Sequence, residues 1–251
     1  MTLPESLAGR LYVLACRPDS GWAPTGAEAA LLLRAATLAE LWLAGLVVAE
    51  GGRGPGDPKG LVAMSASGPQ PPRTVVLGRE VTDPVVVRAL TDPAAAALLA
   101  EIGARPKPRN WAWWVGHGER ETARVVEKQL AALGVIELVR SRRWGVFGRS
   151  CLRLREPEAV ETVRATAREA LVGERPVAEL DPRDVVFAAL AVAGGIKPLW
   201  ERAERRAARD RLTELQALAG PVPAALRKVI KDREATIAGA ATVAAVAASS
   251  G

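Results

Sequence analysis

Apolar and polar residues follow each other along this chain mostly with the period of an α-helix. Apolar positions three and four residues apart, bounded by glycine or proline, predict helices over residues 3–14, 26–43, 118–133, 157–171, 182–193, 198–218 and 221–248. Residues 83–103 show the same period with a break at Asp92-Pro93, and the glycine-rich stretch 51–60 predicts a loop. Period-two alternation predicts strands over 74–81, 135–140 and 149–155. The pattern predicts a mainly α fold, a single helical domain over residues 1–251 with a β-hairpin.

The helix predicted at 118–133 has a basic side. Arg120, Arg124 and Lys128 recur every four residues, so they stack on one side of a helix. The apolar side of the same helix comprises Val125, Val126, Leu130 and Leu133. Because Glu121 and Glu127 lie three residues from Arg124, an ordinary solvated face is the alternative to an anion-binding ridge.

The turn of the predicted hairpin combines arginines with bulky apolar residues. The candidate membrane-inserting residues are Arg142, Arg143, Trp144, Val146 and Phe147. Arginine binds phosphate through paired hydrogen bonds, and a neighbouring aromatic ring stacks on a base or lies among lipid headgroups. Two interpretations follow: the wing of a winged-helix nucleic-acid-binding protein, or a hairpin that inserts into an anionic membrane. Three bulky apolar residues in one turn favour the membrane.

Arg34 lies within the apolar stripe of the helix predicted at 26–43. A charged side chain among apolar neighbours needs a partner, because an isolated buried charge is costly. A structural salt bridge, or a side chain that reaches past the edge of the core, is one explanation for this residue. An anion-binding site between helices is the other.

Composition restricts the possible partners and the cellular compartment only loosely. The chain has 251 residues, 49% of them hydrophobic, and a formal net charge of +6 that permits either nucleic acid or an acidic membrane as partner. Its two cysteines, Cys16 and Cys151, provide no disulfide framework and fit a reducing cytoplasm. The sequence pattern contains neither a secretory signal nor an apolar run long enough to span a bilayer, so membrane contact is expected to be peripheral.

Catalytic and metal-binding patterns are missing from the sequence. His117 is the only histidine, and it has no second metal ligand and no nucleophile motif nearby. Trp111, Trp113 and Trp114 are more typical of a core than of a ligand platform. We therefore expect no catalytic residue, no metal and no cofactor, and a binding protein rather than an enzyme.

Several segments, in order along the chain, resemble the Golgi phosphoprotein 3 family. They are residues 34–47, 82–90, Asn110-Trp111, 120–136 and 184–190. The resemblance covers roughly residues 3–248, which it implies form the core of the domain. It also implies a mainly helical fold with a projecting apolar hairpin that enters the membrane, and a basic pocket nearby for the headgroup of phosphatidylinositol 4-phosphate.

The resemblance assigns Arg34 and Arg120 to this pocket. A third family arginine falls at Ala123, beside Arg124, and the pocket tryptophan falls near Thr25, three residues after Trp22. The predicted headgroup-binding residues are therefore Arg34, Arg120, Arg124 and Trp22.

The arginine-rich and alanine-rich composition suggests a bacterial member of the family. The expected partner is an anionic phospholipid membrane surface, approached from the cytoplasm. Membrane-protein cargo and further copies of the chain are open as partners, and nucleic acid is the less favoured alternative.

Overall fold

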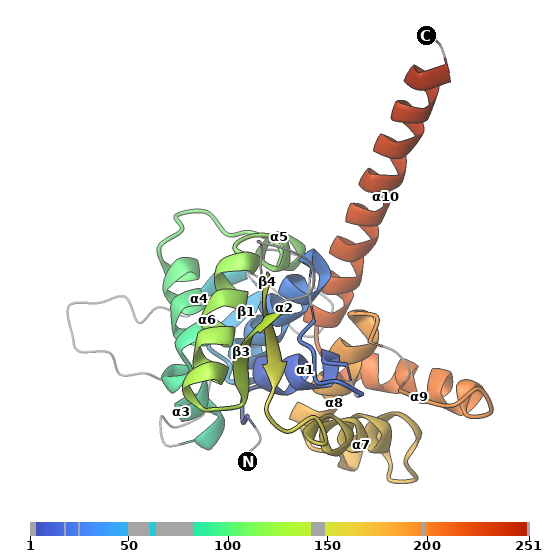
Figure 1. Ribbon diagram of the computed structural model, residues 1–251. Helices are drawn as coiled ribbons and strands as arrows, with labels where there is room; N and C mark the ends of the chain where they lie inside the picture. The colour runs from blue at the N-terminus through green and yellow to red at the C-terminus, as the bar shows by residue number, and fades with distance from the viewer. Residues whose placement is uncertain are drawn as a thin grey trace.

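The computed structural model describes residues 4–17, 19–24, 26–49, 61–63, 83–141, 149–196 and 199–249 (Figure 1). The helices are α1 (Leu7–Ala15), α2 (Ala27–Leu43), α3 (Pro84–Thr91), α4 (Pro93–Gly103), α5 (Trp111–Gly116), α6 (Glu119–Ala132), α7 (Ala159–Val172), α8 (Pro182–Ala193), α9 (Arg205–Leu218) and α10 (Val222–Ser249), with a 3-10 turn at Val177–Glu179. The strands are β1 (Val47–Ala49), β2 (Leu61–Ala63), β3 (Ile136–Ser141) and β4 (Arg149–Leu154). The mainly α class predicted from the sequence is confirmed.

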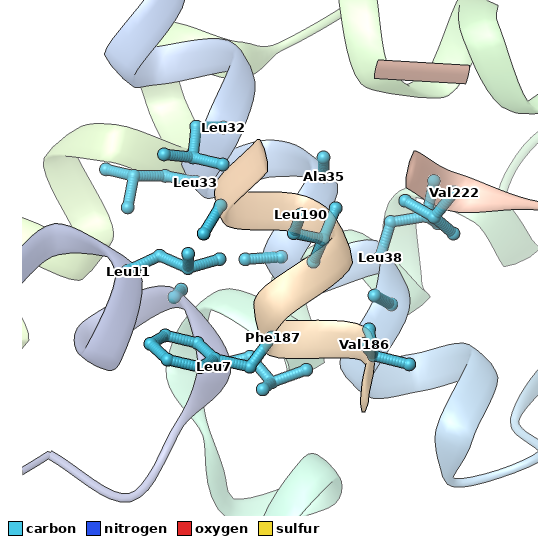
Figure 2. Packing of buried hydrophobic residues seen from close by; sticks show 14 of the residues in the cluster. Leu7, Leu11, Leu32, Leu33, Ala35, Leu38, Val186, Phe187, Leu190 and Val222 are labelled. Atoms are coloured by element: carbon cyan, nitrogen blue, oxygen red, sulfur yellow. The ribbon is translucent and has the colours of Figure 1, made fainter. Parts of the chain in front are cut away.

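Helix α2 lies at the centre of the fold, since every residue from Ala30 to Leu41 is buried. Helices α1, α4, α5, α6, α8 and α10 pack against it. Figure 2 shows side chains of α1 and α8, among them Leu11 and Phe187, meeting those of α2. A helix that is covered on all sides is normally apolar on all sides. Its two buried charged residues, Arg34 and Glu40, therefore need partners inside the fold.

Short polar residues and glycines set several helix ends. Asp92 follows α3, and its carboxylate accepts the N–H of Ala95 in the first turn of α4, so the predicted break at Asp92-Pro93 is confirmed. Gly45 and Gly134 follow α2 and α6 with φ of +69° and +71°. Glycine adopts this left-handed conformation without a steric penalty, which explains both helix ends.

Two predicted helix starts are wrong by several residues. The first helix begins at Leu7 rather than residue 3, because the Ser6 hydroxyl accepts a backbone N–H of the first turn and caps the helix there. Helix α9 begins at Arg205 rather than residue 198. The residues just before it form a turn in which the Glu201 N–H donates to the Glu204 carboxylate at 2.7 Å.

The apolar side predicted for α6 is correct at Val126 and Leu130, which are buried, and wrong at Leu133, which is 62% exposed. Helix α6 ends at Ala132, so Leu133 falls past the last turn that packs on the core. The helical period thus stops predicting burial where the helix itself stops.

Both sheets are two-stranded and antiparallel. In β3 and β4, Ile136 pairs with Leu154 and Ser141 with Arg149, which confirms the strands of the predicted hairpin. Strands β1 and β2 form a second pair, which the sequence pattern did not predict. The predicted loop at 51–60, the predicted strand at 74–81 and the hairpin turn at 142–148 lie outside the described residues.

Helix α10 starts inside the fold and ends outside it. Its first half packs against α2, α5 and α8, and Figure 1 shows its second half extending away from the other helices. Among the helices in the described ranges, α10 included, none is long and apolar enough to cross a membrane.

Candidate functional site

Arg34 is buried in the fold, with only 2% of the residue exposed, and its guanidinium group is held by three hydrogen bonds. Its Nε donates to the backbone oxygen of Trp114 at 3.0 Å and one Nη to the Thr122 hydroxyl at 3.0 Å. The other Nη donates to a carboxylate oxygen of Glu101 at 2.7 Å, which forms an ion pair. The structural explanation for an arginine in the apolar stripe is therefore present: Arg34 joins α2 to α4, α5 and α6.

Gly118 lets the backbone pass close to this guanidinium group. It precedes α6 with φ of +70°, a conformation that residues with a side chain rarely adopt. A Cβ atom at this position would lie 3.3 Å from an Nη of Arg34. Both the backbone angle and the space beside Arg34 therefore call for glycine.

We expect Gly118→Ala to destabilise the protein more than Gly134→Ala. Both glycines have nearly the same φ, but a Cβ at Gly134 would meet nothing within 4 Å, so that variant isolates the backbone strain. The strain alone costs about 1 to 2 kcal/mol. Urea denaturation of both variants measures the difference, and equal losses would show that the space beside Arg34 is not restrictive.

The Glu101 carboxylate is shared by three cationic or titratable side chains. Besides Arg34, it lies 4.0 Å from Arg105 Nη2 and 3.8 Å from His117 Nε2. Arg105 Nη2 also lies 3.0 Å from His117 Nε2. Because guanidinium nitrogen only donates, the His117 ring nitrogen is the acceptor in that contact. One carboxylate thus faces more positive charge than it can neutralise.

Trp113 lies at the centre of a surface group that continues from Glu101. Its ring stacks on that of His117, with ring centres 4.2 Å apart and planes 22° apart. The guanidinium carbons of Arg105 and Arg109 lie 4.4 Å and 5.3 Å from the centre of the Trp113 ring, within cation–π range. We name Arg105, Arg109, Trp113 and His117 the basic–aromatic cluster.

The sequence prediction missed part of this cluster. Trp111 and Trp114 are buried, as expected for core residues, but Trp113 is only half-buried. Arg105 and Arg109 were not selected at all. Their signal was the basic, proline-spaced connector at 105–109, placed directly before a tryptophan-rich helix.

The basic side of α6 is solvent-exposed. Arg120, in the first turn, and Lys128 are both exposed. Arg124 pairs with Glu121 at 3.9 Å, and both side chains are more than two-thirds exposed, at 76% and 71%. An exposed pair of this kind contributes at most about 1 kcal/mol, so Arg124 stays available to an anionic surface.

Glu119 begins α6 and receives a hydrogen bond from Arg233 of α10 at 2.8 Å. Partial burial alone would raise the pKa of Glu119, but the hydrogen bond from Arg233 and a bond from its own N–H lower it below the usual value. The stabilisation that depends on ionised Glu119 is therefore present above the unfolded-state pKa, near 4.5, and is lost as pH falls below it.

We expect the difference in unfolding free energy between wild type and Glu119→Gln to shrink as pH falls from neutral towards about 3. The reason is that the wild-type carboxylate becomes protonated and then resembles the amide. Urea denaturation at a series of pH values measures this difference. A difference that stays constant over the whole range would contradict the lowered pKa.

The described fold and the comparison with known families agree. The family model for Golgi phosphoprotein 3 (GPP34) matches residues 7–233 of this chain, nearly its whole length. The chain belongs to the Golgi phosphoprotein 3 family. Among curated proteins, none matches this chain significantly.

The four residues that the Golgi phosphoprotein 3 resemblance assigned to the headgroup pocket differ in their exposure. Arg34 is buried, and Arg120 and Arg124 are exposed on α6. Ala123, where the family has an arginine, is half-buried and packs against the core. Thr25 lies outside the described residues.

Trp22 lies beside strand β4. It bridges to Arg153 of β4 and lines an open cavity of about 700 Å³, together with Arg17, Arg164 and Glu127 among others. Arg34 is not among the described residues that line this cavity. Headgroup binding by Trp22 and headgroup binding by Arg34 are therefore two predictions that need separate tests.

The remaining predicted site residues lie in the hairpin turn. Arg142, Arg143, Trp144, Val146 and Phe147 all fall outside the described residues, so membrane insertion stays a prediction. Within the described ranges, no group of three or more histidine, cysteine or acidic side chains is arranged to hold a metal ion.

Proposed function

We propose that this member of the Golgi phosphoprotein 3 family is a peripheral membrane protein that binds anionic phospholipid. Its basic–aromatic cluster takes a headgroup like that of phosphatidylinositol 4-phosphate, and its hairpin turn inserts into the bilayer. The observation that carries the proposal is the excess of positive charge around one partly exposed carboxylate, where the guanidinium groups of Arg34 and Arg105 both face Glu101.

A headgroup phosphate suits these donors better than the Glu101 carboxylate does. A phosphomonoester carries up to two negative charges and three strong acceptor oxygens, and guanidinium groups bind it through paired hydrogen bonds. The Glu101 side chain is 32% exposed and can turn towards water, whereas the Arg34 side chain is 3% exposed and fixed. In this proposal the phosphate displaces Glu101 and takes its place between the three cationic or titratable groups.

The surroundings of the cluster fit contact with a lipid surface. Trp113 is half-buried, and tryptophan favours the membrane–water interface because its ring is apolar and its N–H is polar. Arg109 and Arg120 add positive charge nearby in the chain, and each basic residue close to an anionic membrane contributes about 1 kcal/mol. Family membership supports the same function through the resemblance given above.

Vesicle flotation tests the proposal. The full chain should float with phosphatidylcholine vesicles that contain phosphatidylinositol 4-phosphate, and more weakly with vesicles of equal surface charge made with phosphatidylserine. Neutral vesicles should leave it in solution, and binding should weaken as salt screens the exposed charges over about 8 to 10 Å. Failure to bind any anionic vesicle at low salt would overturn the proposal. Retention on duplex DNA in a parallel gel shift, without vesicle binding, would favour the nucleic-acid alternative.

The part assigned to the hairpin turn has its own test. Trp144→Ser combined with Phe147→Ser should reduce vesicle residence, by up to about 1.5 to 3 kcal/mol for each side chain that is fully buried in lipid. Leu138→Ser is the matched control, because Leu138 lies on β3 of the same hairpin and is 62% exposed. Equal vesicle binding by the double variant and the control, or a large loss of stability in the double variant, would contradict insertion.

A further inference from the structure

The side chains described in the second half of α10 are exposed to solvent. Just before it, Arg233 donates a hydrogen bond to Glu119 of the folded body, and Thr236 lines an open cavity beside α5. Residues 234–240 are all exposed, including Ile237 at 71%. A Cβ atom added at Gly239 would meet nothing within 4 Å. Figure 1 shows this half of α10 standing clear of the other helices.

The same segment contains no charged side chain. From residue 235 to the last residue, 251, the sequence contains no lysine, arginine, aspartate or glutamate. Its polar side chains are two threonines and two serines, and the Thr236 hydroxyl donates to the backbone oxygen of Asp232 at 2.8 Å. The helix thus satisfies its own backbone and at least one of its hydroxyls, as a segment in an apolar medium must. A contiguous apolar helix exposed to water normally has a binding partner.

The distribution of apolar positions indicates lipid rather than a second helix. A helix that pairs with another shows one apolar stripe and a polar opposite side. In residues 235–248 alanine, valine and isoleucine occupy positions all round the helix, and the two threonines do not define a polar side. An environment that is apolar on every side, such as the acyl chains of a membrane, matches this pattern.

Basic residues precede the apolar segment directly. Between residues 227 and 234 the chain has four basic residues and two acidic ones, and Arg227, Lys228 and Lys231 are exposed. Lys228 is paired with Asp232 at 2.7 Å. Positive charge at the edge of an apolar helix is typical of the headgroup region of an anionic membrane, where long basic side chains reach the phosphates.

Length and direction limit how this helix can meet the membrane. The fifteen residues from Ala235 to Ser249 extend about 22 Å as a helix, less than the roughly 20 residues that span a bilayer. In Figure 1 α10 extends towards the side of the molecule at which β3 ends and β4 begins. The segment lies beyond the part of the chain that matches the Golgi phosphoprotein 3 family model, residues 7–233.

We propose that residues 235–249 of α10 enter the acyl layer of one leaflet of an anionic membrane and form a second anchor. The anchor rests on the proposed function, because it requires the body of the protein to approach a membrane. Residues 235–249 lie outside the part of the chain that matches the family model, so the anchor is an element separate from the proposed headgroup site.

An environment-sensitive fluorophore on α10 tests the anchor. Ile237→Cys, labelled with a nitrobenzoxadiazole dye in the full chain carrying Cys151→Ser, places the dye on the segment. Cys16 stays unlabelled, because burial raises its pKa to about 12 and a protonated thiol is unreactive. Ala224→Cys is the matched control, since Ala224 is an exposed residue of the same helix next to the body. Phosphatidylcholine vesicles with and without phosphatidylserine are the probe.

With anionic vesicles, dye at residue 237 should shift its emission to shorter wavelength and gain intensity severalfold, while dye at 224 should change little. Vesicle binding without a shift at 237 would overturn the anchor and leave the proposed function intact. A shift that needs no vesicles and grows with protein concentration would overturn it in favour of a second copy of the chain. Charge-dependent binding that shifts the dye at 237 and is lost on truncation after Glu234, but is unchanged by Arg105→Gln with Arg109→Gln, would support the anchor and overturn the headgroup proposal. No vesicle binding at all would overturn both.

Discussion

Arg34→Met is expected to lower the free energy of unfolding by about 3 kcal/mol, because removing one partner of a buried ion pair is strongly destabilising. Methionine fills much of the same volume but leaves the Trp114 oxygen and the Thr122 hydroxyl without their donor. Glu101 loses its buried partner as well, although its partial exposure lets water compensate some of the loss. Urea denaturation followed by circular dichroism measures the change.

A double-variant cycle separates the ion pair from general damage to the core. Glu101→Leu alone should also destabilise, because it leaves the Arg34 guanidinium buried without a counter-charge. Arg34→Met combined with Glu101→Leu should be less damaging than the sum of the two single variants, since the charges are removed together. Strict additivity, or a loss below about 1 kcal/mol for Arg34→Met, would contradict the structural role of this pair.

Glu40→Ala should be at least as damaging, by about 3 to 5 kcal/mol, because Glu40 has two buried partners. One carboxylate oxygen accepts the N–H of Leu7, the first residue of α1, at 2.8 Å, and the other lies 2.8 Å from Arg183 of α8. The Glu40 and Arg183 side chains are only 3% and 11% exposed. Burial raises the pKa of Glu40, and the Leu7 N–H opposes that shift. The alanine variant would leave the Leu7 N–H without its acceptor and would remove this counter-charge from Arg183, which keeps a hydrogen bond to the backbone oxygen of Glu5.

Asp184→Asn is the matched control for Glu40→Ala. It removes an ion pair that joins α1 to α8, the 2.9 Å contact of Arg10 with Asp184, but these side chains are 19% and 32% exposed. We expect a loss of no more than about 1 kcal/mol, as for other partly exposed pairs. Similar losses in both variants, measured by urea denaturation, would show that burial does not determine the strength of these contacts.

The sequence predicted most elements of the fold because local signals determine them. Glycines with positive φ end α2 and α6, and Asp92-Pro93 separates α3 from α4, as their positions in the sequence indicated. Strands β1 and β2 were missed, since each has only three residues and the pairing joins segments on opposite sides of the 51–60 stretch. Such short strands depend on each other and carry little pattern of their own.

The site was less accessible to sequence reasoning. The position of Arg34 in an apolar stripe correctly indicated that it needed a partner, but Glu101 lies 67 residues away and reaches it only through tertiary packing. Arg105 and Arg109 were missed for a related reason. Their importance comes from contact with Trp113, which arises when the connector at 105–109 folds back on α5. The turn at 142–148 is still a prediction from the sequence alone.

We propose that the basic–aromatic cluster, and not positive charge in general, holds the protein on anionic membranes. The most direct test of this proposal compares two variants of equal net charge: Arg105→Gln with Arg109→Gln, and Arg202→Gln with Arg206→Gln. Arg202 lies just before α9 and Arg206 lies in its first turn, and both are exposed. Helix α9 lies far from α5 in Figure 1.

The measurement is the dissociation constant for vesicles containing phosphatidylinositol 4-phosphate at physiological salt. The cluster variant should bind roughly 25-fold more weakly, from about 2 kcal/mol for two basic residues, and the α9 variant should stay within about twofold of wild type. Equal weakening of both variants, or unchanged binding by the cluster variant, would contradict the proposal.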